Sequence, residues 1–229
     1  MSISTFSQKV TCIICAFAIV SCNKPIVDLG KLTVGQPLNV GIADGATKVE
    51  NQDGHIESTE EGFNIVDNGE KVVHYTFSDS DTKNLTFYGF QLKESQATRV
   101  STYNDNLAFI SFELQENQSK DFLTIFKKEL GEPDSVTIEY VMVETLKDEV
   151  IENLKSGFPN YCKVHEDDLG NKVIDYPQRA YWIKNDVAYC LSLDPINQSV
   201  NAKMDIISKK ALADKIIIGY QTDYFNPFN

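Results

Sequence analysis

The stretch R-V-S-T-Y-N-D-N-L-A-F-I-S-F-E-L-Q-E-N-Q-S-K-D-F-L-T-I-F-K-K-E-L-G-E-P, residues 99–133, decides the fold class. Its first half contains two runs rich in β-branched and aromatic residues, 99–103 and 107–114. Asn104-Asp105-Asn106 separates them, and Asn and Asp tolerate the backbone angles of tight turns. The sequence therefore predicts a β-hairpin at this position.

The second half of the stretch predicts a helix over residues 119–130. Ser119 can cap its start, and Gly131 followed by Pro133 can end it. Apolar side chains recur between these signals at the spacing of one helix face: Phe122, Ile125, Phe126 and Leu130.

A second helix is predicted over residues 145–156. Thr145 with Asp148 three residues later resembles a capping box, and Gly157 and Pro159 close the segment. Its apolar face comprises Leu146, Val150, Ile151 and Leu154. Both apolar faces are typical of helices that pack on a core.

The rest of the chain is rich in strand signals. Asp53-Gly54 and Asn68-Gly69 are favoured hairpin turns, and each lies between two β-prone runs. They predict that residues 47–50 pair with 55–58, and that 63–66 pair with 71–77. Further strands are predicted over residues 135–142, 161–165, 172–175, 179–183, 187–193, 202–208 and 215–221. The runs 179–183 and 187–193 flank Lys184-Asn185-Asp186 and are predicted to form another hairpin.

Alternation within residues 135–142 places Val136, Ile138 and Tyr140 on one face of that strand. Taken together, these patterns predict an α+β fold, mainly an antiparallel sheet with two helices, about 119–130 and 145–156. We expect one globular domain over residues 31–229.

The N-terminal region has the pattern of an export signal. Residues 10–20 form an apolar run that is too short to span a bilayer, and Lys9 precedes it. The run ends in Ile19-Val20-Ser21-Cys22, which resembles the lipobox of bacterial lipoproteins.

The resemblance implies a signal peptide over residues 1–21, acyl chains such as palmitate on Cys22, and a tether over residues 22–30. It implies a cell-envelope location, anchored to membrane through Cys22. The residue directly after Cys22 is Asn23 rather than an acidic residue, which favours the outer membrane, facing the periplasm. An ordinary cleaved signal or an uncleaved anchor is the alternative.

The net charge and the cysteine content limit the kinds of partner and the bonds that we expect for this chain. The formal net charge of −12 argues against nucleic acid, whose phosphates require clustered Lys and Arg. Cys12 and Cys15 lie inside the signal, so Cys162 and Cys190 are the pair left for an oxidising compartment. We expect a disulfide between them; two buried free thiols are the alternative.

No catalytic, metal or cofactor motif is evident. The histidines are His55, His74 and His165, and the sequence has no G-x-S-x-G, H-E-x-x-H or phosphate-binding loop. We therefore expect a non-catalytic binding or structural lipoprotein whose partner is an envelope protein, a peptide or a glycan, with no cofactor. The alternative is a lipid-anchored hydrolase with a site near His165, in the run His165-Glu166-Asp167-Asp168.

Aromatic residues on the predicted strands suggest a platform for glycans or peptides: Tyr88, Phe90, Tyr181, Trp182 and Tyr189. Leu130-Gly131-Glu132-Pro133 and Trp182 resemble helix-plus-hairpin units of the small lipoprotein of the outer-membrane β-barrel assembly machinery and of β-lactamase-inhibitor proteins. That resemblance implies a similar local unit and no function.

Overall fold

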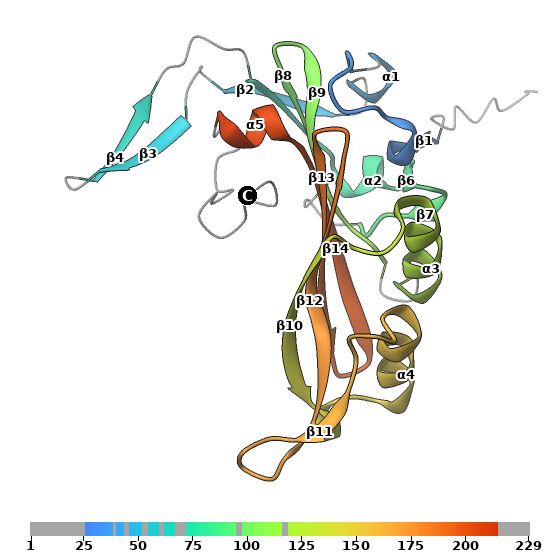
Figure 1. The fold of residues 1–229 in the computed structure, drawn as a ribbon. Coiled ribbons are helices and arrows are strands. Elements are labelled where there is room, and N and C mark those ends of the chain that lie inside the picture. Colours follow the sequence, from blue (N-terminus) through green and yellow to red (C-terminus); the bar gives the residue numbers. More distant parts are fainter. Residues whose placement is uncertain are drawn as a thin grey trace, which may run out of the picture.

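The computed structural model describes residues 26–38, 40–43, 46–51, 55–59, 62–66, 72–94, 98–115 and 119–214. One large, mostly antiparallel sheet dominates it, with helices packed on its faces (Figure 1). The α+β class predicted from the sequence is confirmed.

The large sheet consists of two four-stranded meanders. The first comprises β2 (Thr47–Asn51), β5 (Val72–Thr76), β8 (Arg99–Tyr103) and β9 (Asn106–Glu113). The second comprises β10 (Ser135–Met142), β12 (Lys172–Lys184), β13 (Val187–Ile196) and β14 (Ser199–Ser208). The last strands of the meanders, β9 and β14, pair antiparallel in the middle of the sheet. The first strands, β2 and β10, therefore lie at its two ends, and β11 (Val164–Glu166) adds to β12.

Two tight turns set the register within the meanders. Asn104 and Asp105 have φ of 51° and 63°, and Asn185 and Asp186 have φ of 49° and 61°. Positive φ at both central residues is the geometry of the type I′ turn, which matches the twist of the strands it joins. The hairpins predicted at these positions are confirmed as β8–β9 and β12–β13.

The two hairpins predicted earlier in the chain are wrong. β3 (His55–Thr59) pairs with β4 (Gly62–Val66), and β2 pairs with β5 across this insertion. Figure 1 shows β3 and β4 apart from the large sheet. A dipeptide such as Asp-Gly favours a turn and says nothing about which strands the turn joins. The four residues of the two predicted turns lie outside the described residues.

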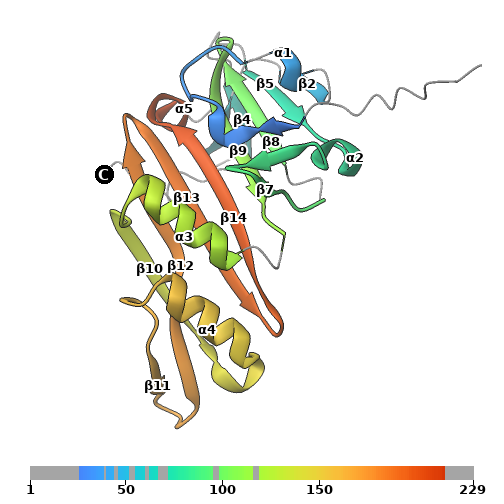
Figure 2. The ribbon, with the colours of Figure 1, turned by 90° about the vertical axis from the view of Figure 1, so that its right-hand side faces the viewer.

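Aromatic packing holds α3 (Ser119–Leu130) on one face of the sheet, and α3 has the predicted bounds (Figure 2). Phe122 and Phe126 stack at 5.3 Å between ring centroids, and Phe126 meets the buried Trp182 edge-on at 4.9 Å. Trp182 Nε1 donates a hydrogen bond of 2.9 Å to the carbonyl of Gly131. Ile125 was predicted for this face but is exposed.

The second helix, α4 (Asp148–Gly157), begins later than predicted. A 3₁₀ turn, η3 (Val143–Thr145), precedes it, and the residue at the N-cap is Lys147, with no side-chain capping bond. Thr145 Oγ1 donates to the Met142 carbonyl, 2.7 Å away, so it serves the preceding turn rather than the helix. The predicted apolar face is buried against the sheet.

The N-terminal segment belongs to the fold from Val27 onward. β1 (Val27–Asp28) pairs parallel with β6 (Leu85–Phe87), which pairs with β7 (Phe90–Gln91), and Leu29, in the 3₁₀ turn η1 (Leu29–Lys31), is fully buried. Asp28 Oδ1 accepts from the backbone N–H of Gly30 at 3.0 Å and of Tyr88 at 2.8 Å. The predicted tether over residues 22–30 is therefore too long.

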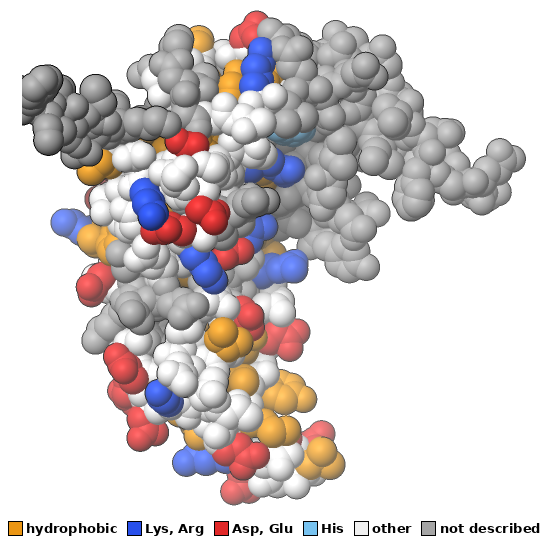
Figure 3. Space-filling model, turned by 180° about the vertical axis from the view of Figure 1, so that it is seen from behind, with side chains coloured by type: hydrophobic (Ala, Val, Ile, Leu, Met, Phe, Trp, Pro, Cys, Tyr) orange, Lys and Arg blue, Asp and Glu red, His pale blue; other side chains and the backbone are white. Residues whose placement is uncertain are grey.

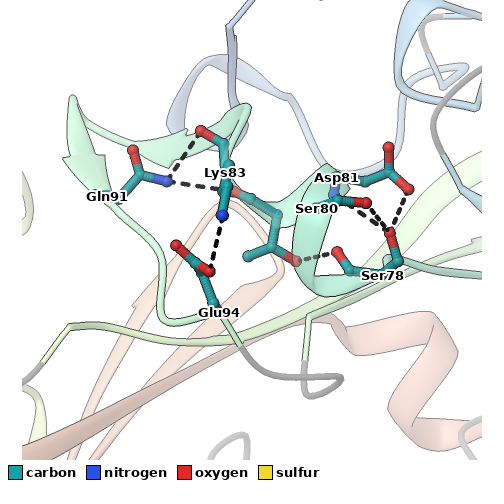
Figure 4. A network of polar contacts seen from close by, with 7 residues as sticks. Ser78, Ser80, Asp81, Lys83, Gln91 and Glu94 are labelled. Carbon is teal, nitrogen blue, oxygen red and sulfur yellow. Dashed lines mark hydrogen bonds and ion pairs between the residues drawn. The ribbon is translucent and has the colours of Figure 1, made fainter.

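Polar contacts fasten the corner beside β6 and β7 (Figure 4). Ser78 caps the short helix α2 (Asp79–Thr82). The Gln91 side-chain amide donates to the carbonyls of Thr82, Lys83 and Leu85. An ion pair of 3.4 Å joins Lys83 to Glu94.

Two further short helices lie at the upper end of the sheet: α1 (Val40–Ala43) and α5 (Lys209–Ala213). Ala211 and Leu212 of α5 pack on the face opposite to α3, with Phe109 and Ile207. The strand predicted over residues 215–221 lies outside the described residues.

Trp182→Ala tests the core. We expect it to lower the free energy of unfolding by about 3–5 kcal/mol, because it removes a buried ring and leaves a cavity. Urea unfolding measures the change. Ile138→Ala is the matched control on the exposed side of the sheet, where we expect a loss below about 1 kcal/mol. Equal losses would contradict the core described above.

Candidate functional site

An irregularity in the pairing of β10 with β12 decides which side chains of β10 face solvent. The register shifts between Thr137 and Ile138. Before the shift Val136 packs against the helix-covered core, and after it Val141 does. Even-numbered residues of β10 thus face the helix-covered core before the shift. After the shift they face the opposite side of the sheet, which we call the open side. The predicted common face of Val136, Ile138 and Tyr140 is wrong for this reason.

The open side of β10 presents three exposed apolar residues in a row, which we call the β10 strip: Ile138, Tyr140 and Met142. Their exposed fractions are 42%, 60% and 41%. Cross-strand pairing places them beside Pro177, Asp175 and Val173 of β12. Figure 3 shows hydrophobic side chains gathered over this part of the sheet. Contiguous exposed apolar side chains are typical of surfaces that contact other molecules.

His165 lies one strand away from the strip, on the other side of β12. It is on β11 opposite Val173, and its Nε2 is 2.9 Å from Asp175 Oδ1. The hydrogen bond to Asp175 and a second one to the Glu166 carbonyl raise the pKa of His165. The His165 side chain is 47% exposed and lies on an exposed strand. The hydrolase alternative required a pocket in which His165 and several carboxylates converge, and within the described part of the chain the one carboxylate hydrogen-bonded to its ring is that of Asp175.

The other described histidine side chain is internal. His74, 8% exposed, forms a 2.7 Å hydrogen bond between Nδ1 and Ser101 Oγ of the neighbouring strand. Burial, together with the positive charge of Arg99, lowers its pKa to about 4. The ring is therefore neutral at neutral pH, and its polar atoms are part of the sheet interior.

The predicted disulfide is wrong: Cys162 and Cys190 are both free thiols. Cys162 packs with α4 and donates to the Leu154 carbonyl, whereas Cys190 lies in the cluster under α5. These clusters occupy opposite faces of the sheet, since neighbouring residues of β13 alternate between them. Burial raises the pKa of each thiol to about 12, so neither is a ready nucleophile.

Charged groups also lie inside the face beneath α5. Asp205 is 6% exposed, and its Oδ2 is 3.2 Å from Lys203 Nζ. The Arg99 guanidinium lies 4.9 Å from the centre of the Phe109 ring. Burial lowers the pKa of Arg99, and the carboxylate of Asp205 opposes that shift. This arrangement compensates charge inside the sheet and offers no activated group.

The aromatic platform expected from the sequence does not face solvent. Trp182 and Tyr181 are buried, and Tyr88, Phe90 and Tyr189 are half-buried against the core. Among the described residues the exposed aromatic side chain is Tyr140, which the sequence analysis placed on a strand face without proposing it as a binding residue. Its only signal was the apolar alternation of residues 135–142, and a register shift cannot be inferred from that alternation.

His74 makes stability depend on pH. Its pKa is about 4 in the folded state and about 6.5 unfolded, so the unfolded chain takes up the proton first as pH falls. We expect stability to drop between about pH 6.5 and 4, by on the order of 2 kcal/mol more in the wild type than in His74→Gln. Urea unfolding at several pH values measures the difference.

The control is His165→Gln. The folded pKa of His165 is raised, so its contribution is already present below the unfolded pKa and is lost only as pH rises through the folded value. Acidification below pH 6.5 should therefore affect this variant as it affects the wild type. If His74→Gln kept the full pH dependence of the wild type, His74 would not be neutral in the folded protein.

Among the residues that the structure describes, no group of three or more His, Cys, Asp or Glu is placed to hold a metal ion. Within the same residues, no helix is long and apolar enough to cross a membrane. In comparisons with known proteins, no family model, no curated protein and no solved structure matches this chain.

Proposed function

We propose that this chain is a lipid-anchored envelope protein with a non-catalytic binding role, held in the outer membrane facing the periplasm. The observation that carries the binding role is the β10 strip, three large apolar side chains left exposed in a row. Neighbouring apolar side chains exposed in this way are a cost in water, and contact with a partner removes that cost.

The anchor in this proposal is Cys22, which lies outside the described residues. β1 begins at Val27, and Leu29 is already buried. Five backbone steps from Cys22 to Val27 reach at most about 18 Å. Acyl chains on Cys22 would therefore hold the β1 end of the molecule close to the membrane.

The strip lies elsewhere. Figure 2 shows β1 in the upper part of the molecule and β10 running to the lower end, beside α4 and β11. An anchor at Cys22 would therefore leave the β10 strip in the part of the molecule far from the anchored end. The proposed partner is thus a molecule of the periplasm, or one that reaches into it.

Acyl labelling tests the anchor. In cells supplied with an alkyne-bearing palmitate analogue, we expect the wild-type chain to become labelled and Cys22→Ala to lose the label, because the thiol of Cys22 is the attachment point. Cys162→Ala is the control and should keep the label. Equal labelling of Cys22→Ala and the wild type would contradict the anchor.

Photo-crosslinking tests the binding role. With a benzophenone amino acid replacing Tyr140, we expect irradiation of intact cells to yield a discrete higher-mass adduct on a denaturing gel. The same probe replacing Ile125, which is 39% exposed on α3, controls for random collisions. Adducts of equal amount and pattern from the two positions would contradict a binding surface at β10.

A further inference from the structure

We infer that the partner at β10 is an extended peptide segment with alternating apolar and basic residues, which adds a strand to the open edge of the sheet. This inference rests on the proposed function and specifies its mode and its ligand class. β10 is the terminal strand of the sheet order and pairs only with β12 among the described strands. The outer edge of a terminal strand presents unpaired N–H and C=O groups to an incoming strand.

The β10 edge lacks the usual protection against such pairing. Charged side chains on an edge strand discourage pairing with other chains. Of the eight residues of β10 only Glu139 is charged. β2, at the other end of the sheet, has two charged residues among five, Lys48 and Glu50. Residues 138–142 keep a regular register after the shift, long enough for a five-residue ladder.

The two faces of β10 specify the ligand. A strand added to the edge alternates its side chains between the faces, as β10 does. One set would lie beside Ile138, Tyr140 and Met142, which favours apolar residues. The other set would lie beside the exposed Glu139, and residues 135–146 contain no basic residue. This side favours Lys or Arg.

A second copy of the chain fits this edge less well. Antiparallel pairing of two β10 strands centred on Tyr140 would set the two Glu139 side chains diagonally across from each other, about 7–8 Å apart. The formal net charge of −12 adds repulsion between copies. Anionic lipid is disfavoured by the same charge.

The test uses the full-length protein in neutral detergent micelles and a fluorescent nine-residue peptide, K-V-K-V-K-V-K-V-K. By fluorescence anisotropy we expect saturable binding, weakened at least tenfold by Tyr140→Lys and unchanged by the control Ile125→Lys. By hydrogen exchange we expect the peptide to slow the amides of residues 138–142. Two matched peptides complete the set: the block isomer K-K-K-K-K-V-V-V-V, and the alternating peptide with two adjacent central nitrogens methylated.

Weak binding of both matched peptides supports strand addition, because successive N–H groups point to opposite edges and adjacent methyl groups block both. Equal binding of the block isomer would reduce the effect to charge and overturn the inference. Equal binding of the methylated peptide would overturn it as well. So would protein dimerisation that Tyr140→Lys abolishes, or binding to neutral vesicles through Tyr140. If the peptide fails while Tyr140 still crosslinks in cells, the inference fails and the proposed function stands.

Discussion

The pairing of β9 with β14 is the constraint on which the rest of the architecture depends. Five residue pairs, from Phe109 with Ile207 to Glu113 with Lys203, join two meanders that are otherwise local in sequence. Because the meanders meet through their last strands, their first strands become the two ends of the sheet. The exposure of β10 as an edge is thus a consequence of a contact between segments about 90 residues apart in the chain.

A second consequence arises where β12 changes neighbours. β13 pairs with β12 from Arg179, which lies opposite Ser192, toward the C-terminal end of β12. β11 pairs with β12 from Ile174 toward its N-terminal end. Pro177 lies in the interval, where no ladder on that side requires its missing N–H. The register shift against β10 occurs at the same place. The interval that accommodates the proline also rotates Ile138, Tyr140 and Met142 out of the core, so one local irregularity generates the candidate surface.

Local signals in the sequence were sufficient to predict turns and a helix, but they were insufficient to predict which strands pair with each other. The Asn104-Asp105 and Asn185-Asp186 turns and the helix over residues 119–130 were predictable, because the turn angles and the helix signals are encoded within a dozen residues. The partners of β2 and the faces of β10 depend on other strands, so period-two alternation alone misplaced them. The expected bond between Cys162 and Cys190 failed for a related reason, since spacing in the chain does not show that they lie on opposite faces of one sheet.

The acidic charge and the open edge are best understood together. Copies anchored in one membrane would be concentrated in a plane, where an unprotected edge strand invites association between like chains. The negative charge of Glu139 on the strand and the net charge of −12 on the chain oppose that association, and they leave the backbone groups of the edge accessible. The same negative field attracts a basic segment, so a single electrostatic property would discourage self-pairing and favour the proposed ligand. In that case the apolar strip would only fix the register of the added strand and the face on which its apolar side chains lie. The negative charge would select the class of partner.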